Sequence, residues 1–216
     1  MTVQQLIAHV EKSLELAKQK KSKCDVETLQ IKGFSTHTMR HFFNNLCSGP
    51  VKTYLECGAF FGASACAAMC GNKQLTSYII EDFSQNFSEE GARDSLLASL
   101  QAVKSKTGNL VFIEKNCYEV PVRETFSVPV NAMFFDAEHS FPSQAKALPY
   151  FFDALSDVSL FIVDDWAWPD PSKATRESFS LMKDRVKVER EWILSDGGPD
   201  GPVWHNDLAV FILRKL

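Results

Sequence analysis

The chain has 216 residues, 45% of them hydrophobic and 23% charged, which is typical of one folded α/β domain or at most two small domains. The net charge of −4 and the lack of a long basic tract argue against nucleic acid as a partner. No segment approaches the ~18 apolar residues of a membrane span, and no signal-peptide core is found. We therefore expect a cytoplasmic protein without a membrane partner.

The first 50 residues are predicted to be helical. Apolar residues recur at helical spacing over 3–20, near 25–31 and over 35–47, and Ser48-Gly49-Pro50 ends the third helix. We divide the chain into an N-terminal helical extension, residues 1–50, and a second domain, residues 51–216.

From residue 51 onward, strands and helices alternate. Strands are predicted over 52–57, 75–80, 110–113, 130–135 and 158–163, and helices over 62–70, 88–105, 143–155 and 172–185. This alternation indicates a parallel sheet that is covered by helices on both faces.

The end of the chain differs from this pattern. Residues 186–194 partly alternate between apolar and polar, whereas residues 207–213 are nearly all apolar. The Gly/Pro-rich turn between them, DGGPDGPVWHN, has no room for a crossover helix, so the two strands are expected to be antiparallel. We predict a Rossmann-like three-layer α/β sandwich with a seven-stranded mixed sheet whose last strand is antiparallel.

The six cysteines do not have the spacing of a metal site. No paired C-x-x-C units occur, and the surrounding segments resemble strands and helices rather than loops. We expect buried, reduced thiols at positions 24, 47, 57, 66, 70 and 117.

Ligands of an open α/β sheet bind beyond the carboxyl ends of its strands, so the residues that follow each strand are the candidates. After the first strand, Gly58 lets the turn pass close under a ligand, and Gly62 lets the next helix begin against it. Glu56 suits the ammonium of a methionine moiety and disfavours a pyrophosphate. The alternative is an ordinary turn with small packing residues.

After the second strand come Glu81, Asp82 and Phe83. A carboxylate here can accept hydrogen bonds from both hydroxyls of a ribose, with Asp82 as the first choice and Glu81 as the second. The alternative is two solvated acids at the end of a strand. After the third strand, Asn116 and Cys117 stand where the edge of an adenine would lie.

Acidic residues also follow the fourth and fifth strands. Asp136, Asp164 and Asp165 would repel one another unless a divalent cation such as Mg²⁺ bound between them. Such an ion lowers the pKa of a bound hydroxyl, and His139 is a candidate general base. Alternatively, Asp165 caps a turn and His139 only hydrogen-bonds a loop.

Four further aromatic residues are predicted on the same rim. They either line an acceptor pocket or cover the end of the sheet: Trp166, Trp168, Trp204 and His205.

Together these segments resemble class I S-adenosylmethionine-dependent methyltransferases, most closely the group of catechol-type and macrocin-type O-methyltransferases. The resemblance covers roughly residues 33–214 and rests on YLECGAFFGASA, IIEDFSQ, FFDAEHSF and LFIVDDW. It implies an S-adenosylmethionine site made of Glu56, Gly58, Ala59, Phe60, Gly62, Ser64, Glu81, Asp82, Phe83, Asn116, Cys117 and Asp136.

The resemblance also implies a metal site of Asp136, Asp164 and Asp165. The catechol-type enzymes carry a lysine where this chain has His139, and an asparagine where it has Asp165. Both the base and the metal therefore stay open. In relatives, N-terminal helices form a lid or a dimer contact, which suggests a homodimer and substrate contacts from Arg40, His41 and Asn45.

The expected function is O-methylation of a small hydroxyl-bearing metabolite, with Asp136 and His139 as catalytic residues. One alternative is an NAD(P)-dependent oxidoreductase, against which Glu56 and the closing hairpin argue. Another is a non-catalytic nucleoside-binding protein of the same fold, against which the cluster of Asp136, His139, Asp164 and Asp165 argues.

Overall fold

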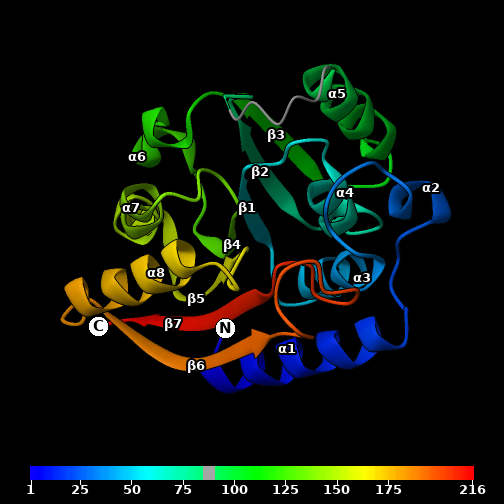
Figure 1. The fold of residues 1–216 in the computed structure, drawn as a ribbon. Coiled ribbons are helices and arrows are strands. Elements are labelled where there is room, and N and C mark those ends of the chain that lie inside the picture. The colour runs from blue at the N-terminus through cyan, green and yellow to red at the C-terminus, as the bar shows by residue number, and fades with distance from the viewer. Residues whose placement is uncertain (85–90) are drawn as a thin grey trace.

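The computed structural model describes residues 1–84 and 91–216, and in these ranges seven strands form one sheet with helices on both faces (Figure 1). The strands are β1 (Thr53–Cys57), β2 (Thr76–Glu81), β3 (Asn109–Glu114), β4 (Val130–Phe135), β5 (Leu155–Val163), β6 (Val186–Leu194) and β7 (Leu208–Lys215). The α-helices are α1 (Val3–Lys18), α2 (Val26–Leu29), α3 (His37–Leu46), α4 (Ala63–Met69), α5 (Ala92–Val103), α6 (Val122–Thr125), α7 (Phe141–Phe151) and α8 (Pro169–Leu181).

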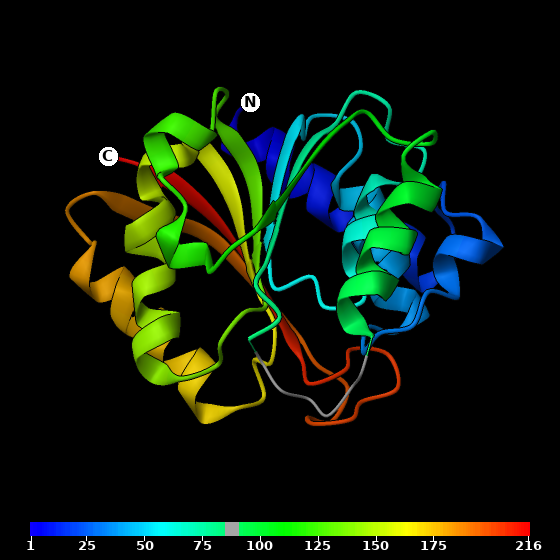
Figure 2. The ribbon, with the colours of Figure 1, turned by 90° about the horizontal axis from the view of Figure 1, so that it is seen from above.

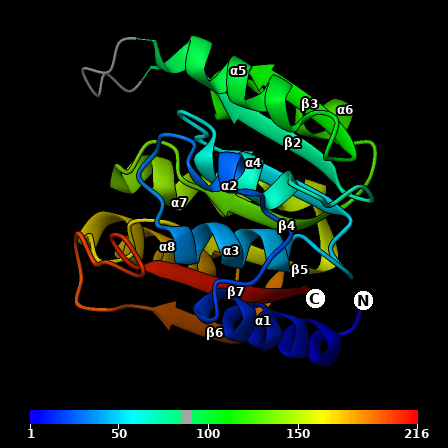
Figure 3. The same cartoon turned by 90° about the vertical axis from the view of Figure 1, so that its right-hand side faces the viewer.

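The order of the strands confirms the predicted mixed sheet. It is β3-β2-β1-β4-β5-β7-β6, and Figure 3 shows these strands stacked from β3 at the top to β6 at the bottom. Strand β7 lies between β5 and β6 and is antiparallel to both. A dinucleotide-binding sheet of the order 3-2-1-4-5-6 has no such inserted strand, so this sheet departs from the oxidoreductase pattern.

The burial of the last two strands follows their apolar patterns. The first six residues of β7 are all buried, whereas β6 lies at the edge and alternates toward solvent. A strand with neighbours on both sides loses its solvent-facing positions, which explains why its sequence is nearly all apolar.

Two hydrophobic clusters fill the spaces above and below the sheet. Helices α1, α3, α4 and α5 contribute to one cluster, and α6 to α8 lie over the other face (Figure 2). Leu6 and Val10 of α1 belong to the same cluster as strand residues, and the rings of Phe43 and Phe134 lie 4.6 Å apart. The N-terminal helices therefore share a core with the sheet.

Some element boundaries differ from the predictions. Helix α7 ends at Phe151 instead of continuing to residue 155, and a 3₁₀ turn (Phe152–Ala154) leads into β5. Leu155 already pairs with Val130, so β5 begins three residues before the predicted strand. Apolar residues keep helical spacing through this segment, so the sequence pattern does not show where the helix ends.

Two other segments also depart from the prediction. Helix α8 begins at Pro169, because a proline fits the first turn of a helix, where its missing N–H costs nothing. A 3₁₀ turn (Cys117–Glu119) and the short α6 follow β3 and were not predicted.

The start of the predicted helix over 88–105 lies outside the described residues, which place α5 at 92–103.

No described helix combines the length and the apolar character needed to cross a membrane. All six cysteines are free thiols, five of them buried and Cys24 partly so, which confirms the prediction for them.

Candidate active site

A cavity of about 1410 Å³ opens at the carboxyl ends of the strands. It is lined by residues from the turns after β1 to β5 and by the loop between β6 and β7. The sequence-predicted residues that line it are Gly58, Phe60, Glu81, Asp82, Phe83, Asn116, Cys117, Asp136, His139, Asp164, Asp165, Trp168 and His205.

Other predicted residues lie behind the cavity wall. Ala59 and Ser64 line a small adjoining pocket of about 50 Å³, and Glu56 and Gly62 line neither space. Trp204 is buried and packs edge-on against Phe42.

The turn after β1 passes directly under the turn after β4. Gly58 has a φ of 90°, and a Cβ atom there would lie 1.9 Å from the carbonyl oxygen of Asp136. Only glycine allows this approach together with this backbone conformation. The glycine therefore brings the first turn and Asp136 to one place.

Glu56 is fully buried beneath this turn. Its two carboxylate oxygens accept hydrogen bonds from the hydroxyls of Tyr54 at 2.6 Å and Ser64 at 2.5 Å. Burial raises the pKa of Glu56 to about 8. Glu56 has no exposed surface and lines neither cavity, so its contact with a ligand stays a prediction.

The acids after β2 are both hydrogen-bonded. The carboxylate of Glu81 accepts from the backbone N–H groups of Phe60 and Phe83, each at 2.7 Å, and so joins two turns. The carboxylate of Asp82 accepts from the backbone of Ser84 and from the side-chain amide of Asn116, each at 2.9 Å. Burial opposes the ionisation of Asp82, but these hydrogen bonds outweigh it and lower its pKa.

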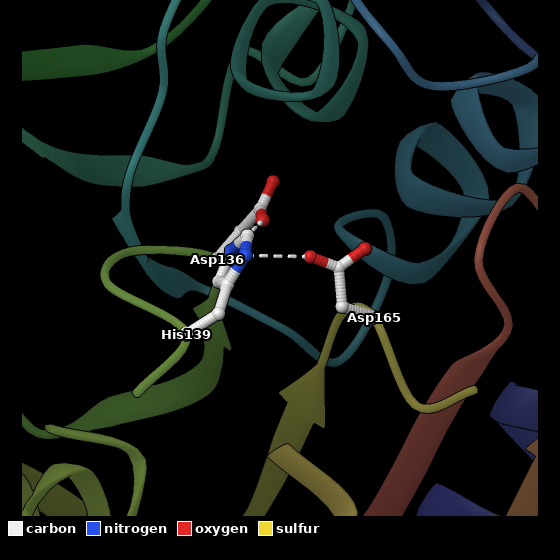
Figure 4. Close-up of side chains that lie close together, drawn as sticks. All are labelled: Asp136, His139 and Asp165. Atoms are coloured by element: carbon white, nitrogen blue, oxygen red, sulfur yellow. Dashed lines mark ion pairs between the residues drawn. The ribbon is translucent and has the colours of Figure 1, made fainter. Parts of the chain in front are cut away.

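His139 lies between two carboxylates that follow neighbouring strands (Figure 4). Its Nδ1 is 2.8 Å from Oδ2 of Asp165, and its Nε2 is 3.4 Å from Oδ1 of Asp136. The longer contact lacks hydrogen-bond geometry, so the buried Nε2 has no hydrogen-bond partner. Nδ1 is therefore anchored by Asp165, while Nε2 lies beside Asp136 without a hydrogen bond.

The charges of this cluster shift the ionisation of its members. Burial alone would lower the pKa of His139, but Asp136 and Asp165 outweigh it and raise that pKa to about 10. Burial also opposes the ionisation of Asp165, but His139 outweighs it and lowers the pKa of Asp165. Burial raises the pKa of Asp136 to about 6, which agrees with the longer distance of this carboxylate from the ring.

The cluster fits a divalent cation. Ligand atoms of Asp136, His139 and Asp165 lie within 4.8 Å of one another, and Asp164 is outside this set among the described residues. One oxygen of Asp164 is nevertheless buried without a hydrogen-bond partner. Burial and the charges of Asp136 and Asp165 raise the pKa of Asp164, and a cation nearby would relieve this repulsion. The structure therefore offers His139 in one of two roles, as a third ligand through Nε2 or, with Nε2 unligated, as the base.

The three candidate substrate contacts on α3 have other partners. Arg40 donates hydrogen bonds to the backbone carbonyls of Leu29 and Ile31, His41 bonds to Ser22, and Asn45 donates to a backbone carbonyl. None of the three lines the cavity. Their side chains hold the connections between the N-terminal helices.

Phe34 and Asn206 are among the residues that line the cavity and were not predicted from the sequence. Phe34 is 59% exposed, and its ring stacks between those of Phe60 and His205. Asn206 donates from its amide to Oδ1 of Asp165 at 2.7 Å. The only available signal for Asn206 was its place before the last strand, since asparagine favours turns.

No model of a known protein family matches the sequence, and no curated protein is found similar to it. Among solved structures, the chain is similar to an O-methyltransferase from Bacillus cereus in complex with S-adenosylhomocysteine. The identity is 12% and the TM-score 0.59, over 96% of this chain and 91% of that chain.

It is also similar to the O-methyltransferase TomG from Streptomyces achromogenes, involved in tomaymycin synthesis and solved with S-adenosylmethionine. The identity is 14% and the TM-score 0.56, over 96% of this chain and 89% of that chain. A precorrin 8w decarboxylase from Methanobacterium thermoautotrophicum matches at 13% identity and a TM-score of 0.54, over 86% and 94% of the chains. The chain therefore has the Rossmann-like methyltransferase fold, and its activity has to be argued from the site.

Proposed function

We propose that this protein is an S-adenosylmethionine-dependent methyltransferase that methylates a hydroxyl oxygen of a small metabolite. One observation carries the proposal: a single cavity joins the acids after β2 to the His139 cluster after β4 and β5. Between them lies Gly58, just after β1, where the strand order reverses: β2 lies on one side of β1 and β4 on the other. Such switch points are where open α/β sheets bind ligands.

The cofactor half of the site is assigned to the turns after β1, β2 and β3. The carboxylates of Glu81 and Asp82 have lone pairs left for ribose hydroxyls, and Asn116 lies beside Asp82 at the adenine side. When bound, S-adenosylmethionine supplies an electrophilic methyl group. The protein then has to align the acceptor and remove its proton.

His139 is assigned as the general base. Asp165 holds Nδ1, so Nε2, which has no hydrogen bond, is assigned as the atom that takes the hydroxyl proton. Because an imidazole must be neutral to act as a base, the raised pKa of His139 predicts that activity increases with pH. A divalent cation held by Asp136 and Asp165 would lower the pKa of a bound hydroxyl.

Cofactor binding is tested by calorimetric titration with S-adenosylhomocysteine. We expect wild-type protein to bind it, and Asp82→Asn to bind roughly 10–100-fold more weakly, because a hydrogen bond to a charged group contributes ~1.5–3 kcal/mol. Asp157→Asn, an exposed aspartate on β5, serves as the matched control and should bind like wild type. Absence of binding at millimolar concentration, or stabilisation by NADH instead, overturns the proposal.

Turnover is tested with methyl-labelled S-adenosylmethionine and a panel of phenols, catechols and sugars. We expect labelled methyl ethers, and a loss of about 10²–10⁴-fold in rate for His139→Gln, with cofactor binding retained. Repeating the assay with EDTA and with added Mg²⁺ decides whether a metal takes part. Binding without transfer to any acceptor would favour the non-catalytic alternative.

A further inference from the structure

The loop between β6 and β7 reaches the His139 cluster through the side chain of Asn206. The amide nitrogen of Asn206 donates to Oδ1 of Asp165 at 2.7 Å, and its amide oxygen accepts from the backbone N–H of Asp200 at 3.2 Å. Both ends of this short side chain are therefore engaged, one within its own loop and one on Asp165.

Backbone hydrogen bonds tie the same loop to the turn that carries Asp165. The N–H of Ala167 donates to the carbonyl of Asn206 at 2.9 Å, and the N–H of Trp166 donates to that of Asp207 at 3.1 Å. Asp165, Asn206 and Asp207 have φ values of 53°, 57° and 61°. This left-handed conformation is unfavourable for residues other than glycine, so the contacts around it have to hold it.

The loop itself is anchored away from the cavity. The carboxylate of Asp196 accepts from the backbone N–H groups of Val203 and Trp204 at 2.7 and 2.9 Å. The hydroxyl of Thr36 donates to the carbonyl of Val203 at 2.5 Å. The first two bonds fold the loop on itself, and the third ties it to the start of α3.

Asp165 transmits this constraint to His139. Its Oδ1 accepts from Asn206, while its Oδ2 lies 2.8 Å from Nδ1 of His139. A carboxylate is planar and rigid, so a bond that fixes one oxygen also fixes the direction of the other. Asp165 is only 8% exposed, which leaves little room for water to replace the amide.

We propose that Asn206 is a positioning residue that orients Asp165 and, through it, the imidazole of His139. The use of this orientation in catalysis rests on the proposed methyltransferase function. The orientation itself does not.

The experiment compares Asn206→Gly and Asn206→Asp with wild type. Glycine keeps the left-handed backbone without strain and removes the amide. Aspartate keeps the shape of the side chain and its acceptor for Asp200, but it turns a carboxylate oxygen toward Oδ1 of Asp165. Asp200→Gly is the matched control, since Asp200 is an exposed loop residue with a φ of 62°, and its N–H remains in place.

The first readout is the imidazole N–H proton of His139 in NMR spectra, assigned by its absence in His139→Gln. We expect wild type and Asp200→Gly to show a slowly exchanging Nδ1 proton. In both Asn206 variants this proton should broaden or shift upfield, because the carboxylate that accepts it is no longer held. An unchanged His139 signal in Asn206→Gly overturns the proposal.

The second readout is methyl transfer to an acceptor found with the panel above. We expect kcat to fall about tenfold or more in both Asn206 variants, with KM for the cofactor changed less than about threefold. If wild type fails to bind S-adenosylhomocysteine, the proposed function fails, while the His139 signal still decides the role of Asn206. A changed signal with unchanged kcat would refute the catalytic use of the orientation.

Discussion

Unusual backbone conformations gather around the cavity. Among the described residues other than glycine, seven have a positive φ, and four of these line the cavity: Phe60, Phe83, Asp165 and Asn206. Each such residue costs of order 1–3 kcal/mol and persists only where its surroundings hold it. The other three, Lys20, Asp200 and Asp207, do not line the cavity, so the larger share of this strain lies at one site.

Gly58 gives the sharpest prediction for a single residue. Gly58→Ala places a Cβ against the carbonyl of Asp136, whereas Gly198→Ala adds one to open space at nearly the same φ, 93° against 90°. We expect Gly198→Ala to destabilise by about 1–2 kcal/mol, the cost of a left-handed side chain, and Gly58→Ala to cost clearly more. Urea unfolding of both variants measures the difference.

The same pair of variants separates packing from binding. Affinity for S-adenosylhomocysteine should fall only in Gly58→Ala, because only this change moves the turn under the proposed cofactor. Equal stability and equal affinity in the two variants would show that the turns after β1 and β4 do not approach as closely as described.

The N-terminal helices are parts of the main core. The side chain of Asn44 on α3 is fully buried, and its amide donates to the carbonyls of Ala67 and Cys70 at the end of α4, each at 2.7 Å. The side-chain amide of Asn72 in turn donates a hydrogen bond to the backbone carbonyl of Asn44 at 2.9 Å. Polar bonds inside a buried contact therefore hold α3 against α4.

Truncation of Leu6 tests whether α1 folds with the sheet. Leu6 is 0% exposed in the shared core, whereas Leu181, at the end of α8, is 71% exposed. We expect Leu6→Ala to lower the free energy of unfolding by about 2–5 kcal/mol and Leu181→Ala to change it by less than about 0.5 kcal/mol. Denaturant unfolding followed by both far-UV and near-UV circular dichroism measures both.

A single coincident transition is expected in these experiments, because α1 and the sheet bury one cluster. Two separate transitions, with only the earlier one shifted by Leu6→Ala, would instead support an independent N-terminal unit.

Glu56 links the stability of the whole molecule to pH. Its pKa is raised from 4.5 to about 8 in the folded protein, so the folded state binds a proton that the unfolded state releases. The stabilisation is fully present below about pH 4.5 and is lost as pH rises through about 8. The total change is of order 4–5 kcal/mol, since one pKa unit corresponds to ~1.4 kcal/mol.

Glu56→Gln removes this titration and keeps the shape of the side chain. We expect wild type to lose stability relative to Glu56→Gln as the pH rises from 5 to 8, because only wild type has to give up this proton. Urea unfolding at several pH values measures it. A constant difference over this range would mean that Glu56 does not titrate there and is better solvated than its burial indicates.

The apolar patterns of the chain were sufficient to predict the sheet and the edge at which the site lies. The apolar strand patterns and the short Gly/Pro-rich turn require an antiparallel final hairpin, and parallel strands bring the residues that follow them to one edge. Asp82, Asp136, His139 and Asp165 lie within four residues of the ends of their strands, so the local sequence pattern was sufficient to predict that they share one cavity.

The partners of individual side chains, in contrast, depend on contacts that form only in the folded molecule. The carboxylate of Glu56 is buried and accepts hydrogen bonds from Tyr54 and Ser64. Asn206 donates a hydrogen bond to Asp165, which lies 41 residues earlier in the chain. Phe34 enters the cavity from the N-terminal segment, and α1 enters the core. Contacts between segments far apart in the chain leave no periodic pattern in either segment, so their partners emerge only when the chain is folded.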